Sequence, residues 1–196
     1  MRRPGGADFA PGAYVFPGGT VHGDDMGWGD EIRMAAVREV FEEVGILLAL
    51  RGGRLAHEAD SEKVRAIVAG DKSFGEALRE LRLEPALDRL VLFARWVTPS
   101  PLRRRYDARF FLAQVPPGQV VRPQDGEVTD WTWITPERAL SSPEITLVYS
   151  TRAVLESVAS EPDATRLLAA ARRLKEVPVV EPKMVQTESG WEISRG

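Results

Sequence analysis

The sequence predicts an α+β fold in which helices pack on a mixed β-sheet. Stretches with helical periodicity and short apolar, aromatic runs typical of strands follow one another in irregular order. The 196 residues, of which 43% are hydrophobic, are enough for one domain with a substantial core. We expect a single domain over residues 1–196, with helices and an extended tail from about residue 144 onward.

The clearest predicted helix ends at Val44. Asp30 is a suitable N-cap, Glu31 complements the helix dipole, and Gly45 is placed to end the helix in a left-handed conformation. Between these ends, apolar residues recur at helical spacing: Ile32, Ala36, Val37, Val40, Phe41 and Val44. We expect this face to pack against the core.

Shorter signals predict the remaining elements. Strands are expected where apolar or alternating residues lie between turn residues, at 13–16, 46–50, 90–99, 106–115 and 126–134. Residues 57–88 predict a helical hairpin, and Pro136 starts a short helix. Two more helices are expected at 144–159 and 162–176. Residues 177–193 predict an extended tail that turns at "ESG".

Composition excludes several kinds of protein. The net charge of −3, with both signs interspersed, gives no general attraction to nucleic acid or to an anionic membrane. The absence of cysteine excludes disulfides, thiolate metal sites and a cysteine nucleophile. No stretch approaches the ~20 apolar residues that cross a bilayer, and the N-terminus lacks the apolar run of a secretory signal. We expect a cytoplasmic protein that binds neither nucleic acid nor membranes.

Three glutamates, Glu39, Glu42 and Glu43, share a narrow arc of the predicted helix, because residues three and four apart lie on one face. One interpretation is a solvated acidic face. The other is a divalent cation held among the carboxylates, since Mg²⁺ prefers carboxylate oxygens and keeps positions for water and phosphate. The upstream Gly18–Gly19 turn and the glycine that follows the acidic turn favour the second interpretation.

The segment "REVFEEVGI", Arg38 to Ile46, resembles the end of the Nudix box and matches it at every specified position. The chain therefore resembles the Nudix hydrolases, which cleave a nucleoside diphosphate linked to another group. The resemblance implies a Nudix-type α/β/α sandwich, with the mixed sheet between helices and the hairpin at 57–88 as an insertion. A non-catalytic Nudix-fold ligand sensor or interaction domain is the alternative from another class.

By this resemblance, Glu42 and Glu43 are the principal ligands of Mg²⁺ or Mn²⁺, with Glu39 as a further ligand or the general base. The cation neutralises the diphosphate and lowers the pKa of a bound water, whose proton a glutamate takes. Arg38 is expected to ion-pair with the glutamates and hold their rotamers. These four residues form the predicted catalytic group.

Two other places in the chain are assigned by resemblance. The Gly18–Gly19 backbone is expected to let phosphate approach closely and to supply a carbonyl ligand from Gly19. Glu127 stands where many Nudix enzymes carry an additional catalytic or metal-binding acid, although a loop acid before a strand is an equal alternative.

The upstream half of the box departs from the family pattern. Counting back from Arg38 by the family's spacing reaches Asp24 and Asp30 instead of a glycine and a glutamate. A small insertion within "HGDDMGW" reconciles the two, with Gly29 and Asp30 in the usual places. Because aspartate is one methylene shorter than glutamate, we do not expect Asp30 to hold the metal. We expect Asp24 and its neighbour Asp25 to be solvated loop residues.

The substrate is inferred from segments outside the box. "FAPGAYVFPGGTV" and "ARWVTPSPLRRRYDARFFL" resemble the subgroup that includes the peroxisomal coenzyme A diphosphatase. This implies coenzyme A or acyl-coenzyme A as substrate, cleaved to 3′-phospho-ADP and (acyl-)phosphopantetheine; ADP-ribose, NADH or a nucleotide sugar is the alternative. The resemblance, together with the apolar faces of the helical insertion, also implies a homodimer. Related chains carry an apolar strand before a pair like Arg2 and Arg3, and the tail at 177–193 is one candidate to fill its place.

Basic and aromatic residues supply candidate substrate contacts. Guanidinium groups suit a multiply phosphorylated ligand, and four follow the predicted strand at 90–99: Arg103, Arg104, Arg105 and Arg109. A solvated basic loop is the equal alternative. Trp131, Trp133 and Tyr106 are candidates to stack on adenine, but we expect core positions for them, as for most aromatic residues on strands.

Overall fold

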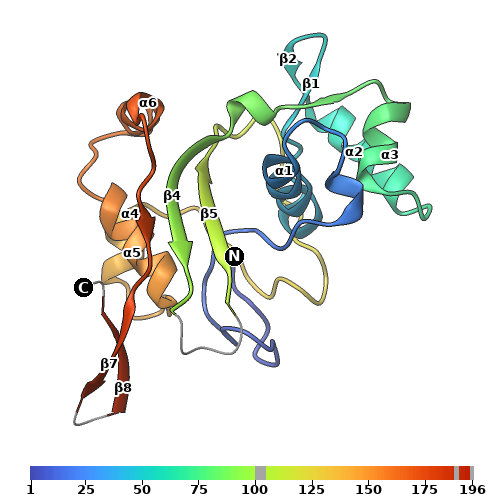
Figure 1. Cartoon of the computed structure of the whole chain (residues 1–196). Helices are drawn as coiled ribbons and strands as arrows, with labels where there is room; N and C mark the ends of the chain where they lie inside the picture. The colour runs from blue at the N-terminus through green and yellow to red at the C-terminus, as the bar shows by residue number, and fades with distance from the viewer. Residues whose placement is uncertain (100–104, 188–189, 195–196) are drawn as a thin grey trace. The chain divides into compact units, whose positions relative to one another are not determined.

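The computed structural model describes residues 1–99, 105–187 and 190–194 (Figure 1). The chain forms two compact units, each described here by itself. The first comprises Met1–Leu90 and Gln114–Trp133, and the second comprises Val91–Ala113 and Ile134–Gly196. Helices and short strands are mixed in both units, which confirms the predicted α+β class. The single domain stays a prediction.

Helix α1, Glu31–Val44, has the ends that the sequence predicts. The Asp30 side chain accepts a hydrogen bond from the Arg33 N–H, which satisfies one of the open donors of the first turn. Gly45 ends the helix at φ 74°, and its N–H donates to the Phe41 carbonyl.

The remainder of the first unit is a small sheet and a helical hairpin. Strand β1, Ala49–Arg51, pairs antiparallel with β2, Arg54–Leu55, and with β3, Glu84–Pro85. The predicted hairpin is confirmed as α2, Glu58–Val68, and α3, Phe74–Glu80. Two short 3₁₀ turns complete the unit, η1 at Gly23–Asp25 and η2 at Leu87–Arg89.

The core of the first unit joins the helical hairpin to α1. The rings of Phe41 on α1 and Phe74 on α3 stack with centroids 5.1 Å apart. The first unit also contains side chains that are almost fully buried: Met34, Val37, Leu47, Val64 and Leu78. Burial of each such side chain contributes roughly 1.5–3 kcal/mol relative to exposure. The apolar faces of α2 and α3 are thus already covered within the unit.

The second unit is built on a three-stranded sheet. Strand β4, Val91–Val97, pairs antiparallel with β5, Asp107–Leu112, and parallel with β6, Val179–Val180. Part of the predicted tail thereby covers one edge of β4. The tail ends in the hairpin of β7, Lys183–Thr187, and β8, Gly190–Ser194.

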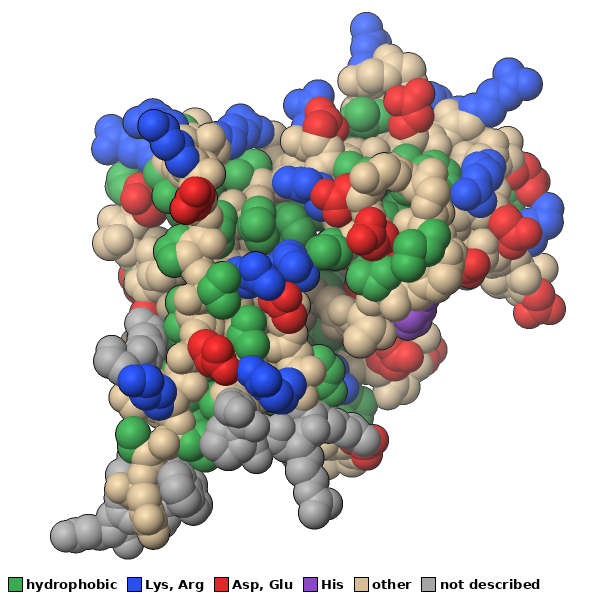
Figure 2. All heavy atoms as spheres, in the orientation of Figure 1, with side chains coloured by type: hydrophobic (Ala, Val, Ile, Leu, Met, Phe, Trp, Pro, Cys, Tyr) green, Lys and Arg blue, Asp and Glu red, His purple; other side chains and the backbone are tan. Residues whose placement is uncertain are grey.

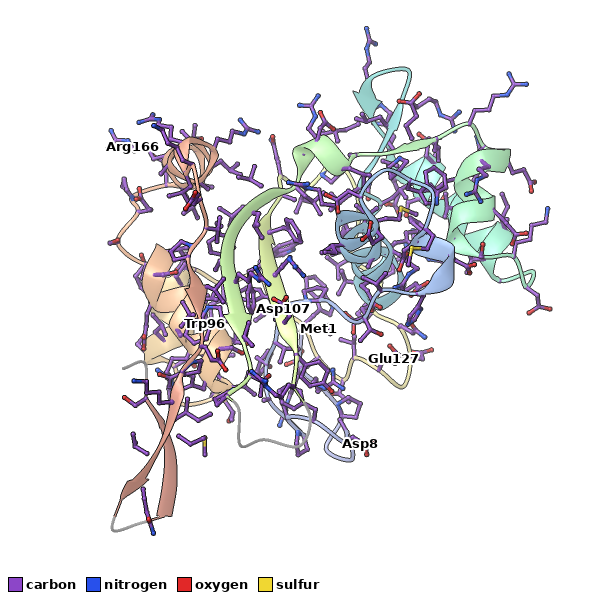
Figure 3. All side chains as sticks on the ribbon, viewed as in Figure 1. Met1, Asp8, Trp96, Asp107, Glu127 and Arg166 are labelled. Atoms are coloured by element: carbon purple, nitrogen blue, oxygen red, sulfur yellow. The ribbon has the colours of Figure 1, made fainter. Side chains whose placement is uncertain are left out.

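Three helices accompany this sheet: α4, Pro136–Ser141, α5, Tyr149–Val158, and α6, Ala164–Arg173. Trp96 of β4, labelled in Figure 3, packs with Ala153 and Val154 of α5. The Tyr149 ring meets Trp96 edge-on, with centroids 6.0 Å apart. Basic side chains gather over α6 in Figure 2, where three of its ten residues are arginines.

Two expected strands are wrong. Residues 13–16 and 126–134 form no strand, because each segment pairs only by an isolated bridge to Arg2, through Tyr14 and Asp130 respectively. One short partner segment cannot support a ladder. Trp131 and Trp133, expected in the core, are 39% and 67% exposed.

The starts of two elements differ most from expectation. The strand expected at 46–50 begins at Ala49, although residues 46–48 are buried as predicted, and the helix expected at 144–159 begins at Tyr149. Among the described residues, no helix combines the length and apolar character needed to cross a membrane.

Candidate active site

Arg38 is the centre of a buried charged cluster on α1. The residue is only 4% exposed. Its Nη1 donates to Glu39 Oε1 and to Glu42 Oε2, both at 2.8 Å. Its Nη2 donates to the Thr20 carbonyl at 2.9 Å and to Asp25 Oδ2 at 3.0 Å, and its Nε donates to Asp25 Oδ1 at 3.0 Å. All five guanidinium N–H groups therefore have acceptors, and the predicted pairing of Arg38 with glutamates is present for two of the three.

Asp25 is the partner that the sequence analysis assigned wrongly. It is fully buried and binds Arg38 through both carboxylate oxygens, where we expected a solvated loop residue. The turn η1 holds it there, because Asp25 Oδ2 also accepts from the His22 N–H at 2.8 Å. Asp30 caps α1 instead and pairs with Arg33. A sequence signal for this role existed: Arg38, once buried, needs a further carboxylate partner, and the loop that carries Asp25 can supply one.

The Gly18–Gly19 turn lies against the glutamates. The Gly18 N–H donates to Glu43 Oε2 at 2.7 Å. A Cβ atom at Gly19 would fall 2.3 Å from Glu39 Oε1, a carboxylate oxygen that Arg38 holds in place. Only glycine fits this close approach. The acids of α1 therefore face a turn and an arginine, and the interpretation of a solvated acidic face does not apply to Glu39 or Glu43.

The cluster carries more negative charge than its cations offset. Burial raises the pKa of Glu43 to about 7; the charges of Glu39 and Glu127 add to this rise, while the Gly18 N–H opposes it. Burial also raises the pKa of Glu42, although its hydrogen bond to Arg38 acts in the opposite direction. For Arg38, burial disfavours the charged form, but the hydrogen bonds to its carboxylate partners prevail and raise its pKa.

Glu127 belongs to a segment attached to the end of α1. The Arg122 N–H donates to the Val44 carbonyl at 2.9 Å, and the Gln124 N–H donates to the Glu43 carbonyl at 3.0 Å. Glu127 follows on the same connection, exposed, and Figure 3 labels it there. It is close enough for its charge to act on Glu43. This geometry brings the predicted additional acid to the cluster.

The residues of the cluster suit a divalent cation in donor type and charge. Within the described ranges, no three histidine or acidic side chains are grouped as ligands of one ion. One oxygen of each glutamate is engaged: Glu39 Oε1 and Glu42 Oε2 by Arg38, and Glu43 Oε2 by Gly18. The second oxygens are hard donors of the kind that Mg²⁺ and Mn²⁺ take. Burial is the main cause of the raised pKa of Glu43, and a cation would offset the carboxylate charges of Glu39 and Glu127 that add to the rise.

The predicted phosphate-binding arginines belong to the second unit. Arg105 donates to Glu181 at 2.7 Å and to the Thr98 carbonyl at 3.0 Å. Arg109 pairs with Asp107 at 3.4 Å. Arg103 and Arg104 lie outside the described residues. Tyr106, expected in the core, is 43% exposed.

Comparison with known proteins gives consistent matches. The family model described as the NUDT19 Nudix domain matches residues 28–149. A putative nudix hydrolase 7 of Caenorhabditis elegans is 33% identical over 141 residues, covering 71% of this chain and 47% of that protein. The acyl-coenzyme A diphosphatase NUDT19 of Xenopus laevis is 24% identical over 200 residues, covering 71% of this chain and 53% of that protein. The chain thus spans about half the length of these curated relatives.

A solved structure is similar over most of its length. The crystal structure of a NUDIX hydrolase from Alicyclobacillus acidocaldarius superposes with a TM-score of 0.72 at 26% sequence identity, covering 90% of this chain and 88% of that one.

Proposed function

Because this chain belongs to the Nudix hydrolase family, we propose that it hydrolyses the diphosphate of a nucleoside diphosphate derivative with the help of Mg²⁺ or Mn²⁺. The proposed substrate is coenzyme A or acyl-coenzyme A, cleaved to 3′-phospho-ADP and (acyl-)phosphopantetheine. The observation that carries the proposal is the set of three glutamates arranged around buried Arg38 and the Gly18–Gly19 turn.

The chain's own residues have separate roles in this proposal. Arg38 fixes one oxygen of Glu39 and one of Glu42, so that their second oxygens keep constant positions. Glu42, Glu43 and the Gly19 carbonyl are the groups that would hold the cation, with Glu39 as a further ligand or as the general base. When bound, the cation neutralises the diphosphate and acidifies a water molecule. Glu39 Oε2 is the atom that we propose takes the proton of that water, with Glu127 as an additional acid.

Substrate choice is proposed from a relative of the chain and from its basic residues. The name of the Xenopus relative supports an acyl-coenzyme A substrate, and the four arginines from Arg103 to Arg109 are the proposed partners of the 3′-phospho-ADP phosphates. Incubation with coenzyme A, acyl-coenzyme A, ADP-ribose, NADH and a nucleotide sugar in Mn²⁺ tests it, with products separated by chromatography. Release of 3′-phospho-ADP is expected, and turnover of the other compounds alone would move the assignment to the ADP-ribose, NADH or nucleotide-sugar class.

A non-catalytic ligand-binding role is disfavoured by the charge arrangement. A binding module has no evident need to bury Glu43 under conditions that raise its pKa to about 7. If coenzyme A binds in Mn²⁺ but none of the tested diphosphates is hydrolysed, the sensor role would replace the enzymatic one.

We also propose a homodimer, on the family resemblance alone. The apolar residues of α2 and α3, which suggested it from the sequence, are buried within the first unit, and Phe74 of α3 stacks on Phe41 of α1. Light scattering at micromolar concentration tests the proposal, and a monomer mass would end it.

A further inference from the structure

Trp28 joins the loop that carries Asp25 to helix α3. The guanidinium of Arg79 lies 4.5 Å from the centre of the indole ring. Gly75 lies one turn before Arg79 on the same helix, and an added Cβ there would meet Trp28 Nε1 and Cζ2 at 3.5 Å and Arg79 Nη1 at 3.6 Å. Indole Nε1 is buried and has no hydrogen-bond partner among the described residues. The ring is therefore held by packing and by Arg79, and not by a hydrogen bond of its N–H.

Asp25 of the same loop is linked to the glutamates through Arg38. Asp25 binds both Nε and Nη2 of Arg38, and Arg38 binds Glu39 and Glu42. Every contact in this series belongs to the first unit. A displacement of the indole would shift the loop and with it Asp25. Because the Asp25–Arg38 pair is buried, water could not replace Asp25 as the partner of Arg38.

We propose that Trp28 is a positioning residue: packed against Gly75 and Arg79 of α3, it holds Asp25 on Arg38, and Arg38 then sets the spacing of Glu39 and Glu42. Helix α3 of the insertion thereby supports the glutamates of α1, although it lies outside the Nudix box. The inference rests on the proposed function for its consequence in catalysis, although the contacts do not depend on it. Gly75 contributes to this arrangement. Glycine is a poor helix former, but a larger residue at this position would reach the indole.

A pair of variants at Gly75 tests this without touching the loop or the glutamates. In Gly75→Ala the added carbon sits at ordinary contact distance, so Mn²⁺ affinity should stay at the wild-type value. In Gly75→Leu the side chain displaces the indole, and Mn²⁺ affinity, measured by electron paramagnetic resonance, should fall by about tenfold, as when partners of metal ligands are removed. Equal affinity in the two variants would overturn the inference.

Surface variants on α3 keep the test valid if Gly75→Leu fails to fold. Arg79 is exposed, so Arg79→Ala should fold and weaken Mn²⁺ binding in the same direction but less. Glu80→Ala, at the next exposed position, removes a contact with Lys72 of the same hairpin and should have no effect. Trp28→Phe should retain wild-type affinity, because the indole N–H has no partner in the described part of the chain, whereas Trp28→Ala should lose affinity. A Trp28→Phe protein as weak as Trp28→Ala would refute a role based on packing.

A metal-independent signal separates this inference from the proposed function. The Arg38 Nε–H is buried in its bond to Asp25 and should give a protected ¹H–¹⁵N resonance, assigned by its loss in Arg38→Lys. This resonance should shift or broaden in Gly75→Leu and Arg79→Ala but not in Glu80→Ala. If wild-type protein binds no Mn²⁺, the proposed function fails, and the resonance still decides the inference. An unchanged resonance in both variants would sink it.

Discussion

Arg38 shows how one buried cation organises several anions. Its charge is taken out of water, which is costly unless the surroundings supply partners for every N–H. Asp25, Glu39, Glu42 and the Thr20 carbonyl do so. Lysine would keep the charge but cannot form the two parallel bonds to one carboxylate.

We therefore expect Arg38→Lys to lower the free energy of unfolding by about 3 kcal/mol, the lower end for a broken buried ion pair. Urea unfolding followed by circular dichroism measures it. Arg33→Lys is the matched control on the same helix, because the side chains of Arg33 and Asp30 are 35% and 33% exposed and loss of their pairing should cost under ~1 kcal/mol. Similar losses for the two variants would mean that burial of Arg38 adds nothing.

Glu43 predicts a pH dependence of the metal-free protein. Its pKa of about 7 exceeds the ordinary value of 4.5, so between these values the unfolded chain releases a proton that the folded chain retains. Stability from this group is complete below pH 4.5 and is lost as pH rises through 7. In the metal-free protein, Glu43→Gln should therefore raise the stability relative to wild type more at pH 8 than at pH 5.

Thermal unfolding in chelator at the two pH values provides the measurement for Glu43→Gln. The same variant should lower turnover in Mn²⁺ by about 100-fold or more, since it removes a proposed ligand. An equal stability difference at pH 5 and pH 8 would contradict the raised pKa, and unchanged turnover would contradict the ligand assignment.

At the scale of elements, local sequence signals predicted the helix ends well. They did not predict pairing between residues far apart in the sequence. The ends of α1 were predicted because Asp30 and Gly45 act on their own backbone neighbourhood. Asp25 was missed because its role depends on Arg38 thirteen residues away, inside a loop whose composition resembles any solvated turn. The strand expected at 126–134 failed because its alternation gives no information on whether a partner strand is available.

The C-terminal end of α1 should be sensitive to any side chain at Gly45. Its φ of 74° strains other residues, and an added Cβ would lie 2.6 Å from Arg65 Nη2 and 3.1 Å from the Arg122 carbonyl oxygen. Gly45→Ala should cost about 1–3 kcal/mol of stability. Gly52→Ala is the control, because Gly52 has positive φ but open space around it, and should cost less. Equal costs would mean that crowding at Gly45 is relieved without strain.

At the scale of the whole molecule, the backbone passes between the two compact units three times, after Leu90, Ala113 and Trp133. Neither unit is therefore one continuous segment. If the second unit unfolded alone, the β4–β5 hairpin would come loose while both of its ends stayed covalently joined to the first unit. On this ground we expect the units to unfold as one cooperative system, as the prediction of a single domain requires.

Metal binding offers a way to test this cooperativity, because the proposed ligands belong only to the first unit. Mn²⁺ at 100 times its dissociation constant should add about 2.7 kcal/mol to the stability of whatever unfolds with the site, slowing its slowest amide exchange by about 100-fold. Hydrogen exchange read by mass spectrometry should show this slowing in peptides from α1 and equally in peptides from β4 and β5. Glu43→Gln should show it in neither. Slowing confined to α1 would mean that the second unit opens independently, and the chain would then be two domains.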